Sequence, residues 1–84
     1  MTIEEYILDR YSEKSVPRYM NQINLFRETL GESAEQSTYS DIVNYIGDLR
    51  KRGLHPKSLR NHLFSLKIYF RYLVETEKRQ EHPC

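Results

Sequence analysis

The sequence is poor in the residues that cross-link or interrupt a chain. Its 84 residues include one cysteine, three glycines, three prolines and no tryptophan. The lone Cys84 excludes a disulfide framework and any zinc site of several cysteines, and it makes a reducing cytoplasm the expected compartment. Because glycine and proline are scarce, the sequence favours helices over a turn-rich β-fold.

Long hydrophobic runs are also missing. No apolar stretch approaches the ~18 residues that a membrane span needs, so we expect no membrane partner. The first residues are acidic, whereas a signal peptide would be basic and then apolar. Ten tyrosines and phenylalanines argue against a disordered chain. A single small domain has little room for a deep, water-excluding pocket, so we do not expect an enzyme within this chain.

Charge is distributed unevenly along the chain. Residues 1–49 carry four Lys or Arg against nine Asp or Glu, and residues 50–84 carry nine against three. The first part therefore has a net charge of −5 and the second +6, although the whole chain carries only +1. This asymmetry is compatible with a face that binds a polyanion, and equally with two solvated surfaces that neutralise each other.

Apolar residues recur at three- and four-residue intervals in four segments. We predict helices over residues 2–11, 15–30, 40–52 and 56–76, and the fold class is therefore all-α. Thr2, Ser15 and Ser40 are the expected N-caps, and Gly31 and Gly53 the expected C-terminal stops. Residues 12–14 and 32–38 are expected to be polar connections.

The last predicted helix has two polar flanks beside an apolar ridge. Drawn as a helical wheel, the ridge consists of Leu59, Leu63, Leu66, Phe70 and Leu73. Four cations lie at about 80° to 160° from it: Lys57, Arg60, Lys67 and Arg71. Hydroxyl and amide side chains occupy the other flank: Ser58, Asn61 and Ser65. Phe64 and Ile68 are predicted to face away from the ridge, as an exposed apolar pair.

Catalytic and metal-binding motifs are missing from the sequence. The three histidines match no metal-ligand spacing, and there is no G-x-S-x-G, P-loop or G-x-G-x-x-G motif. The tyrosines lie mostly on apolar stripes and have no arginine–histidine cluster to activate them. We therefore predict no catalytic residue, no metal site and no cofactor.

Four segments form a more specific pattern: SVPRYMNQINLF (residues 15–26), YSDIVNYI (39–46), GLHPKSLRNHL (53–63) and LKIYFRYL (66–73). Together they resemble the N-terminal core-binding, SAM-like domain of tyrosine recombinases, the phage-integrase and Xer-like family. The resemblance implies a small orthogonal bundle of four helices over residues 1–80. It also implies that residues 81–84, with Pro83, begin a linker to a C-terminal catalytic domain that this chain does not contain.

The family resemblance also implies a function. In that family the domain forms one half of a clamp around double-stranded DNA, with two helices near successive major grooves, while the catalytic domain cuts and rejoins strands. The implied partners are duplex DNA, the catalytic domain of the same parent chain and other recombinase protomers. The implied DNA-binding residues are Ser15, Arg18, Asn21, Lys57, Ser58, Arg60, Asn61, Lys67 and Arg71.

Within that set, the cations would contact phosphates, helped by the cluster of residues 50–52. Asn21, Gln22 and Asn61 are candidate base readers. The alternative interpretation is a helical protein-interaction domain without nucleic-acid binding, anchored by Phe64 and Ile68.

Overall fold

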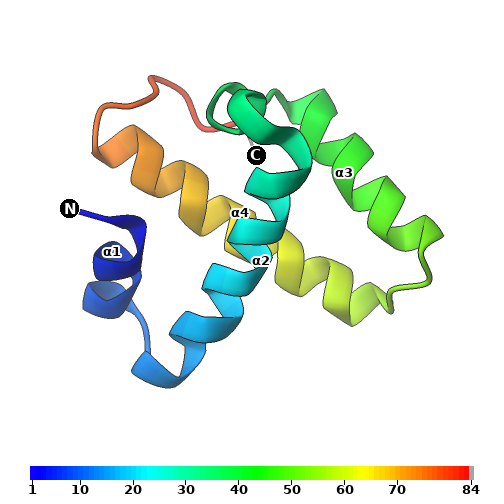
Figure 1. The fold of residues 1–84 in the computed structure, drawn as a ribbon, viewed down its shortest axis with the longest axis horizontal. Helices are drawn as coiled ribbons and strands as arrows, with labels where there is room; N and C mark the ends of the chain where they lie inside the picture. Colours follow the sequence, from blue (N-terminus) through cyan, green and yellow to red (C-terminus); the bar gives the residue numbers. More distant parts are fainter. Residues whose placement is uncertain (84) are drawn as a thin grey trace.

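The computed structural model describes residues 1–83, and every regular element in that range is helical. Two long helices, α2 and α4, cross at the centre of the bundle, with α1 on one side and α3 on the other (Figure 1). The elements are α1 (Ile3–Arg10), the 3₁₀ segment η1 (Glu13–Ser15), α2 (Val16–Leu30), the 3₁₀ segment η2 (Gly31–Gln36), α3 (Tyr39–Lys51) and α4 (Pro56–Glu75). The predicted all-α bundle is therefore confirmed.

Two helices begin with a reciprocal capping box. The Thr2 hydroxyl accepts from the Glu5 N–H at 3.2 Å, and the Glu5 carboxylate accepts from the Thr2 N–H at 2.9 Å. Thr38 and Asp41 repeat this arrangement at the start of α3. The prediction that Ser40 caps α3 is therefore wrong, because Ser40 already lies inside the first turn.

Both predicted connections contain 3₁₀ turns. Before α2, the Ser12 hydroxyl accepts from the Lys14 N–H at 3.3 Å and starts η1. Ser15 occupies the N-cap position of α2 as predicted, but its side chain makes no capping hydrogen bond because its backbone is already helical (φ −87°, ψ −18°). Residues 32–36, expected as part of a polar loop, form η2 together with Gly31. Its buried Ala34 joins the core.

α3 and α4 end in the same hydrogen-bonded motif. After α3, the Gly53 N–H bonds the Arg50 carbonyl at 3.0 Å and the Leu54 N–H bonds the Leu49 carbonyl at 3.4 Å. Gly53 has φ +92°, a conformation that suits glycine. The corresponding residue after α4 is Glu77, at φ +61°.

Aromatic rings form the centre of the core. Phe26 of α2 is fully buried, and its ring packs edge to face against Tyr45 of α3 at 5.0 Å and against Phe70 of α4 at 5.8 Å. On the other side of α4, Tyr6 of α1 packs against Tyr72 at 5.4 Å. These contacts join all four helices.

The prediction that Ile68 is exposed is wrong, because only 3% of its surface is accessible. Ile68 belongs to the same core cluster as Tyr6 and Ile7 of α1 and Val16 of α2. Leu59 and Leu63, expected in the core ridge, are only partly buried. The buried face of α4 is thus rotated away from the predicted ridge and toward Tyr69. Within residues 1–83, no helix combines the length and apolar character needed to cross a membrane.

Candidate nucleic-acid interface

The four predicted cations of α4 lie on its exposed arc. The buried residues of this helix span about 200° of the helical wheel and include Ser65, Ile68 and Leu73. The cations occupy part of the remaining arc, and all four are exposed: Lys57, Arg60, Lys67 and Arg71. In the described part of the chain, both ion pairs involve Arg10. The charges of the four α4 cations are therefore not neutralised by ion pairs within residues 1–83.

The surroundings of these four cations differ along the helix. Lys57 and Arg60 lie in the first two turns, where the His55 Nδ1 caps the helix by accepting from the Lys57 N–H at 3.1 Å. Lys67 borders a groove next to α3. Arg71 is close enough to Tyr6 of α1 for its charge to act on that phenol. The positive arc thus runs from the free end of α4 to the junction with α1.

The first half of α2 lies against the middle of α4. The Ser65 hydroxyl donates to the side-chain oxygen of Gln22, and it also lies 3.2 Å from the Asn61 carbonyl. Ser65 is fully buried, so the expectation that it lies on an outer flank is wrong. Gln22 is partly buried and uses its oxygen inside the helix crossing, unlike the exposed Asn21.

An aromatic cluster extends this crossing toward the surface. The ring of Phe64 lies 6.2 Å from that of Tyr11 and 5.7 Å from that of Tyr19. The guanidinium of Arg18 lies 5.3 Å from the centre of the Tyr19 ring. Phe64 keeps 45% of its surface exposed. The sequence predicted this exposure, but not the two tyrosines that hold the ring.

These contacts relate the predicted site residues of the two helices. Arg18 and Asn21 are exposed in the first half of α2, and Ser15 is partly buried just before it. Ser58 and Asn61 are partly buried in the first half of α4. The Gln22–Ser65 hydrogen bond and the Tyr19–Phe64 contact join these two half-helices. Lys67 and Arg71 follow further along α4.

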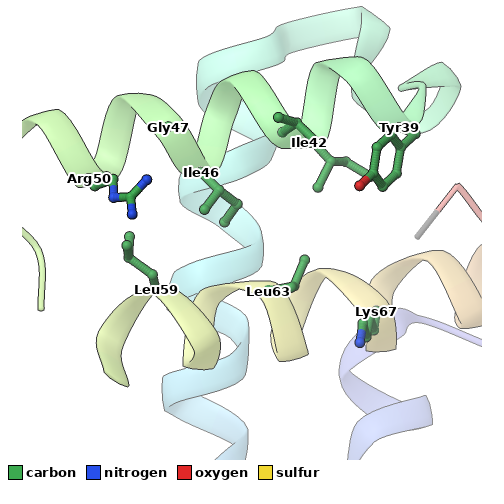
Figure 2. Close-up of a pocket in the computed structure, with 9 residues that line it drawn as sticks. Tyr39, Ile42, Ile46, Gly47, Arg50, Leu59, Leu63 and Lys67 are labelled. Carbon is green, nitrogen blue, oxygen red and sulfur yellow. The ribbon is translucent and has the colours of Figure 1, made fainter. Parts of the chain in front are cut away.

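A groove between α3 and α4 was not expected from the sequence. It has a volume of about 560 Å³, and Figure 2 shows Ile46 of α3 and Leu63 of α4 pointing into the space between the two helices. Arg50 and Lys67 lie at its edges. The groove exists because α3 does not cover the first turns of α4. This incomplete cover also explains why Leu59 and Leu63 are only partly buried.

Other titratable groups of the domain have shifted pKa values. The Tyr6 hydroxyl donates to the Glu75 carboxylate, and burial, followed by this bond and the nearby negative charge, raises the pKa of Tyr6 to about 12. Burial lowers the pKa of His62, whose Nδ1 has no hydrogen-bond partner. Among residues 1–83, no three His, Cys, Asp or Glu side chains are grouped to hold a metal ion.

Comparison with known families agrees with this architecture. The family model described as the N-terminal SAM-like domain of phage integrase matches residues 3–77. The chain belongs to this family. The integrase domain is also 28% identical, over 82 aligned positions, to the tyrosine recombinase XerC of Chlorobaculum tepidum. That alignment covers 86% of this chain and 24% of XerC, so the chain spans about a quarter of its relative. No solved structure matches it. The resemblance drawn from the sequence motifs is thus confirmed.

Proposed function

We propose that this integrase SAM-like domain binds double-stranded DNA as the N-terminal module of a site-specific tyrosine recombinase. The observation that carries the proposal is the exposed arc of α4, in which four cations without carboxylate partners in residues 1–83 flank Phe64, whose ring packs on Tyr19 of α2. Strand cleavage and rejoining belong to a C-terminal catalytic domain of the same parent protein. Other recombinase protomers on the same DNA are further partners, and the proposed compartment is the cytoplasm.

Phosphate contacts supply most of the affinity in this proposal. Lys57, Arg60, Lys67 and Arg71 neutralise backbone phosphates and release counterions, so that binding weakens steeply as salt is added. Ser15 and Ser58 donate hydroxyl hydrogen bonds to phosphates, and Arg18 adds a further charge. Asn21 and Asn61, on either side of the helix crossing, are the candidates for bonding base edges.

The same comparison supports the domain boundary that we propose. Residues 1–80 form the DNA-binding domain, and residues 81–84 begin the linker to the catalytic domain. The family match ends at residue 77, close to this boundary. Cys84, within the proposed start of the linker, lies outside the described residues.

Fluorescence anisotropy with a labelled duplex tests the proposal. The parent domain is titrated from about 50 to about 200 mM salt, and two charge-reversal variants are compared with it: Lys57→Glu/Arg60→Glu and Lys67→Glu/Arg71→Glu. Each double variant is expected to weaken binding at low salt by roughly tenfold or more, for every duplex sequence. Its salt slope is expected to fall by about 2, one unit for each lost phosphate contact.

The matched control is Arg27→Glu/Lys78→Glu, which changes the net charge by the same amount. Arg27 and Lys78 lie on a different surface, next to the rings of Tyr69 and Tyr72. The control is expected to bind with a nearly unchanged salt slope. If the control and the α4 variants weaken binding equally, only net charge matters and the assignment to α4 is wrong. A parent domain that does not bind duplex DNA at low salt refutes the function itself.

The alternative function is a protein-interaction domain without DNA binding. It requires Phe64 and Ile68 to form an exposed pair that contacts the partner. Because Ile68 is buried in the core, the two residues do not form a surface pair. Phe64 alone remains exposed, and its neighbours on α4 are the cations of the proposed DNA-binding face.

A further inference from the structure

We propose that Phe64 reads DNA sequence by placing its ring against the C5-methyl group of a thymine in the major groove. This inference rests on the proposed DNA binding and adds a specificity to it. It concerns the one large apolar side chain that the α4 arc leaves exposed in the described chain.

The position of Phe64 among the cations is the first argument. The cations lie seven and four residues before it and three and seven residues after it: Lys57, Arg60, Lys67 and Arg71. In a helix of 3.6 residues per turn, all these offsets fall on the same face. If the cations contact phosphates on the two sides of a major groove, the side chain between them points at the bases.

The rigidity of the ring is the second argument. Phe64 packs against Tyr11 at an interplanar angle of 85° and against Tyr19 at 50°. Tyr19 is itself buried, and Tyr11 packs on it at 5.6 Å. The ring of Phe64 is therefore fixed by two neighbours while 45% of the residue's surface stays exposed. A fixed, preorganised apolar group loses little conformational entropy when it meets a ligand.

The chemistry of the major groove identifies the matching feature. Each base pair presents hydrogen-bond donors and acceptors there, and the thymine C5-methyl is the apolar group in the pattern. A phenyl ring offers no hydrogen bond, so contact with donors and acceptors alone would leave their hydrogen bonds unmade. Contact with a thymine methyl removes apolar surface from water on both sides. Phe64 thus selects thymine over cytosine at the position it faces.

Replacing thymine by uracil isolates this methyl group, because the base pairing is unchanged. The test compares the binding of the domain to alternating poly(dA-dT) and to alternating poly(dA-dU) at one fixed low salt concentration. The alternating sequence ensures that a thymine is available in every register. The parent domain is expected to bind poly(dA-dT) about three- to fourfold more tightly, the change that corresponds to one buried methyl group.

Two variants complete the test. Phe64→Gln is expected to bind both polymers equally while keeping the parent's steep salt dependence, because the cations remain. Val43→Gln replaces an apolar residue of similar exposure, 49%, on α3 and is expected to keep the preference for thymine. Circular dichroism at the assay temperature verifies that each variant is folded. Should Phe64→Gln prove unfolded, Phe64→Leu replaces it, and it is expected to reduce the preference without abolishing it.

Three results would contradict the inference. Equal binding of the parent domain to both polymers means that no methyl group is read. A preference that persists in Phe64→Gln, or in Phe64→Leu at full size, assigns the reading to another side chain. If the parent domain binds neither polymer, DNA binding itself fails, and the inference fails with it. If the parent domain binds both polymers equally, only the role of Phe64 is refuted, and the proposed DNA binding stands.

Discussion

Gly47 offers a direct test of the energetics of α3. It lies in the interior of this helix and lines the groove next to α4. A Cβ atom added at Gly47 would meet no other atom within 4 Å, and the backbone φ is not positive. Gly47→Ala therefore creates no clash, and it removes the cost of glycine in a helix. We expect the free energy of unfolding to rise by about 0.5 to 1 kcal/mol. For a domain of this size, that gain raises Tm by about 2 to 8 °C.

Thermal unfolding followed by circular dichroism measures this gain, and Gly53→Ala is the matched control. A Cβ atom added at Gly53 would also meet no atom within 4 Å, but φ at this glycine is +92°. The same substitution there is expected to destabilise the domain by about 1 to 2 kcal/mol, because a left-handed conformation strains any residue with a Cβ. A lower Tm for Gly47→Ala would refute the reasoning, since it would mean that the glycine serves packing within the folded domain. Equal effects at both glycines would show that φ does not decide the outcome.

Three further predictions concern the helix termini and the buried titratable groups. Glu77→Gly is expected to raise the free energy of unfolding by about 1 kcal/mol, because φ at this position is +61° and strains a residue with a Cβ atom. Urea unfolding measures this free energy, and an unchanged value would contradict backbone strain at Glu77. Tyr6 has a pKa raised to about 12, so its neutral form stabilises the folded state below about pH 10 and that contribution is lost as pH rises through 12. Tyr6→Phe should therefore flatten the stability loss between these pH values, measured by urea unfolding, and an unchanged slope would contradict the shift. Burial lowers the pKa of His62, so this residue stabilises the fold above about pH 6.5 and the stability falls as acid protonates it; His62→Gln should reduce the acid loss, and an equal loss in both proteins would exclude His62 as its source.

Local signals predicted the helices well. Helix bounds agree with the sequence to within a residue or two, because capping residues, apolar spacing and glycine stops act over a single turn. The one wrong cap is Ser40, which lies two residues after the observed cap, Thr38. Thr38 caps α3 because Asp41 lies three residues after it and completes a capping box. The 3₁₀ turns were missed because short polar segments have no periodicity to reveal them.

The face of α4 that is buried could be predicted only in part. Ile68 was expected outside because the apolar ridge of α4 was centred on Leu59. In the structure, α1 packs against α4, as the distance of 5.4 Å between the rings of Tyr6 and Tyr72 shows. The two residues of this contact are 66 positions apart, and no helical wheel can include such a neighbour. At the other end of α4, Leu59 and Leu63 stay half exposed because α3 leaves a groove there.

The candidate site, too, could be predicted from the sequence only in part. The exposed cations of α4 followed from their shared angle on one helix, which is a local property. The role of Gln22 could not follow from it, because the Ser65 hydroxyl that binds its oxygen comes from a residue 43 positions away. The holding of Phe64 by Tyr11 and Tyr19 likewise needed three segments to meet.

The amino-acid sequence alone determined the helical class, the length of each long helix and the arc of α4 that carries positive charge, since these depend on neighbours within a turn or two. Tertiary structure decided which polar groups are withdrawn into the α2–α4 crossing and which apolar ring stays at the surface. The physical reason is that burial depends on what another helix covers. That cover is set by contacts between segments distant in the chain, and only the folded bundle brings them together.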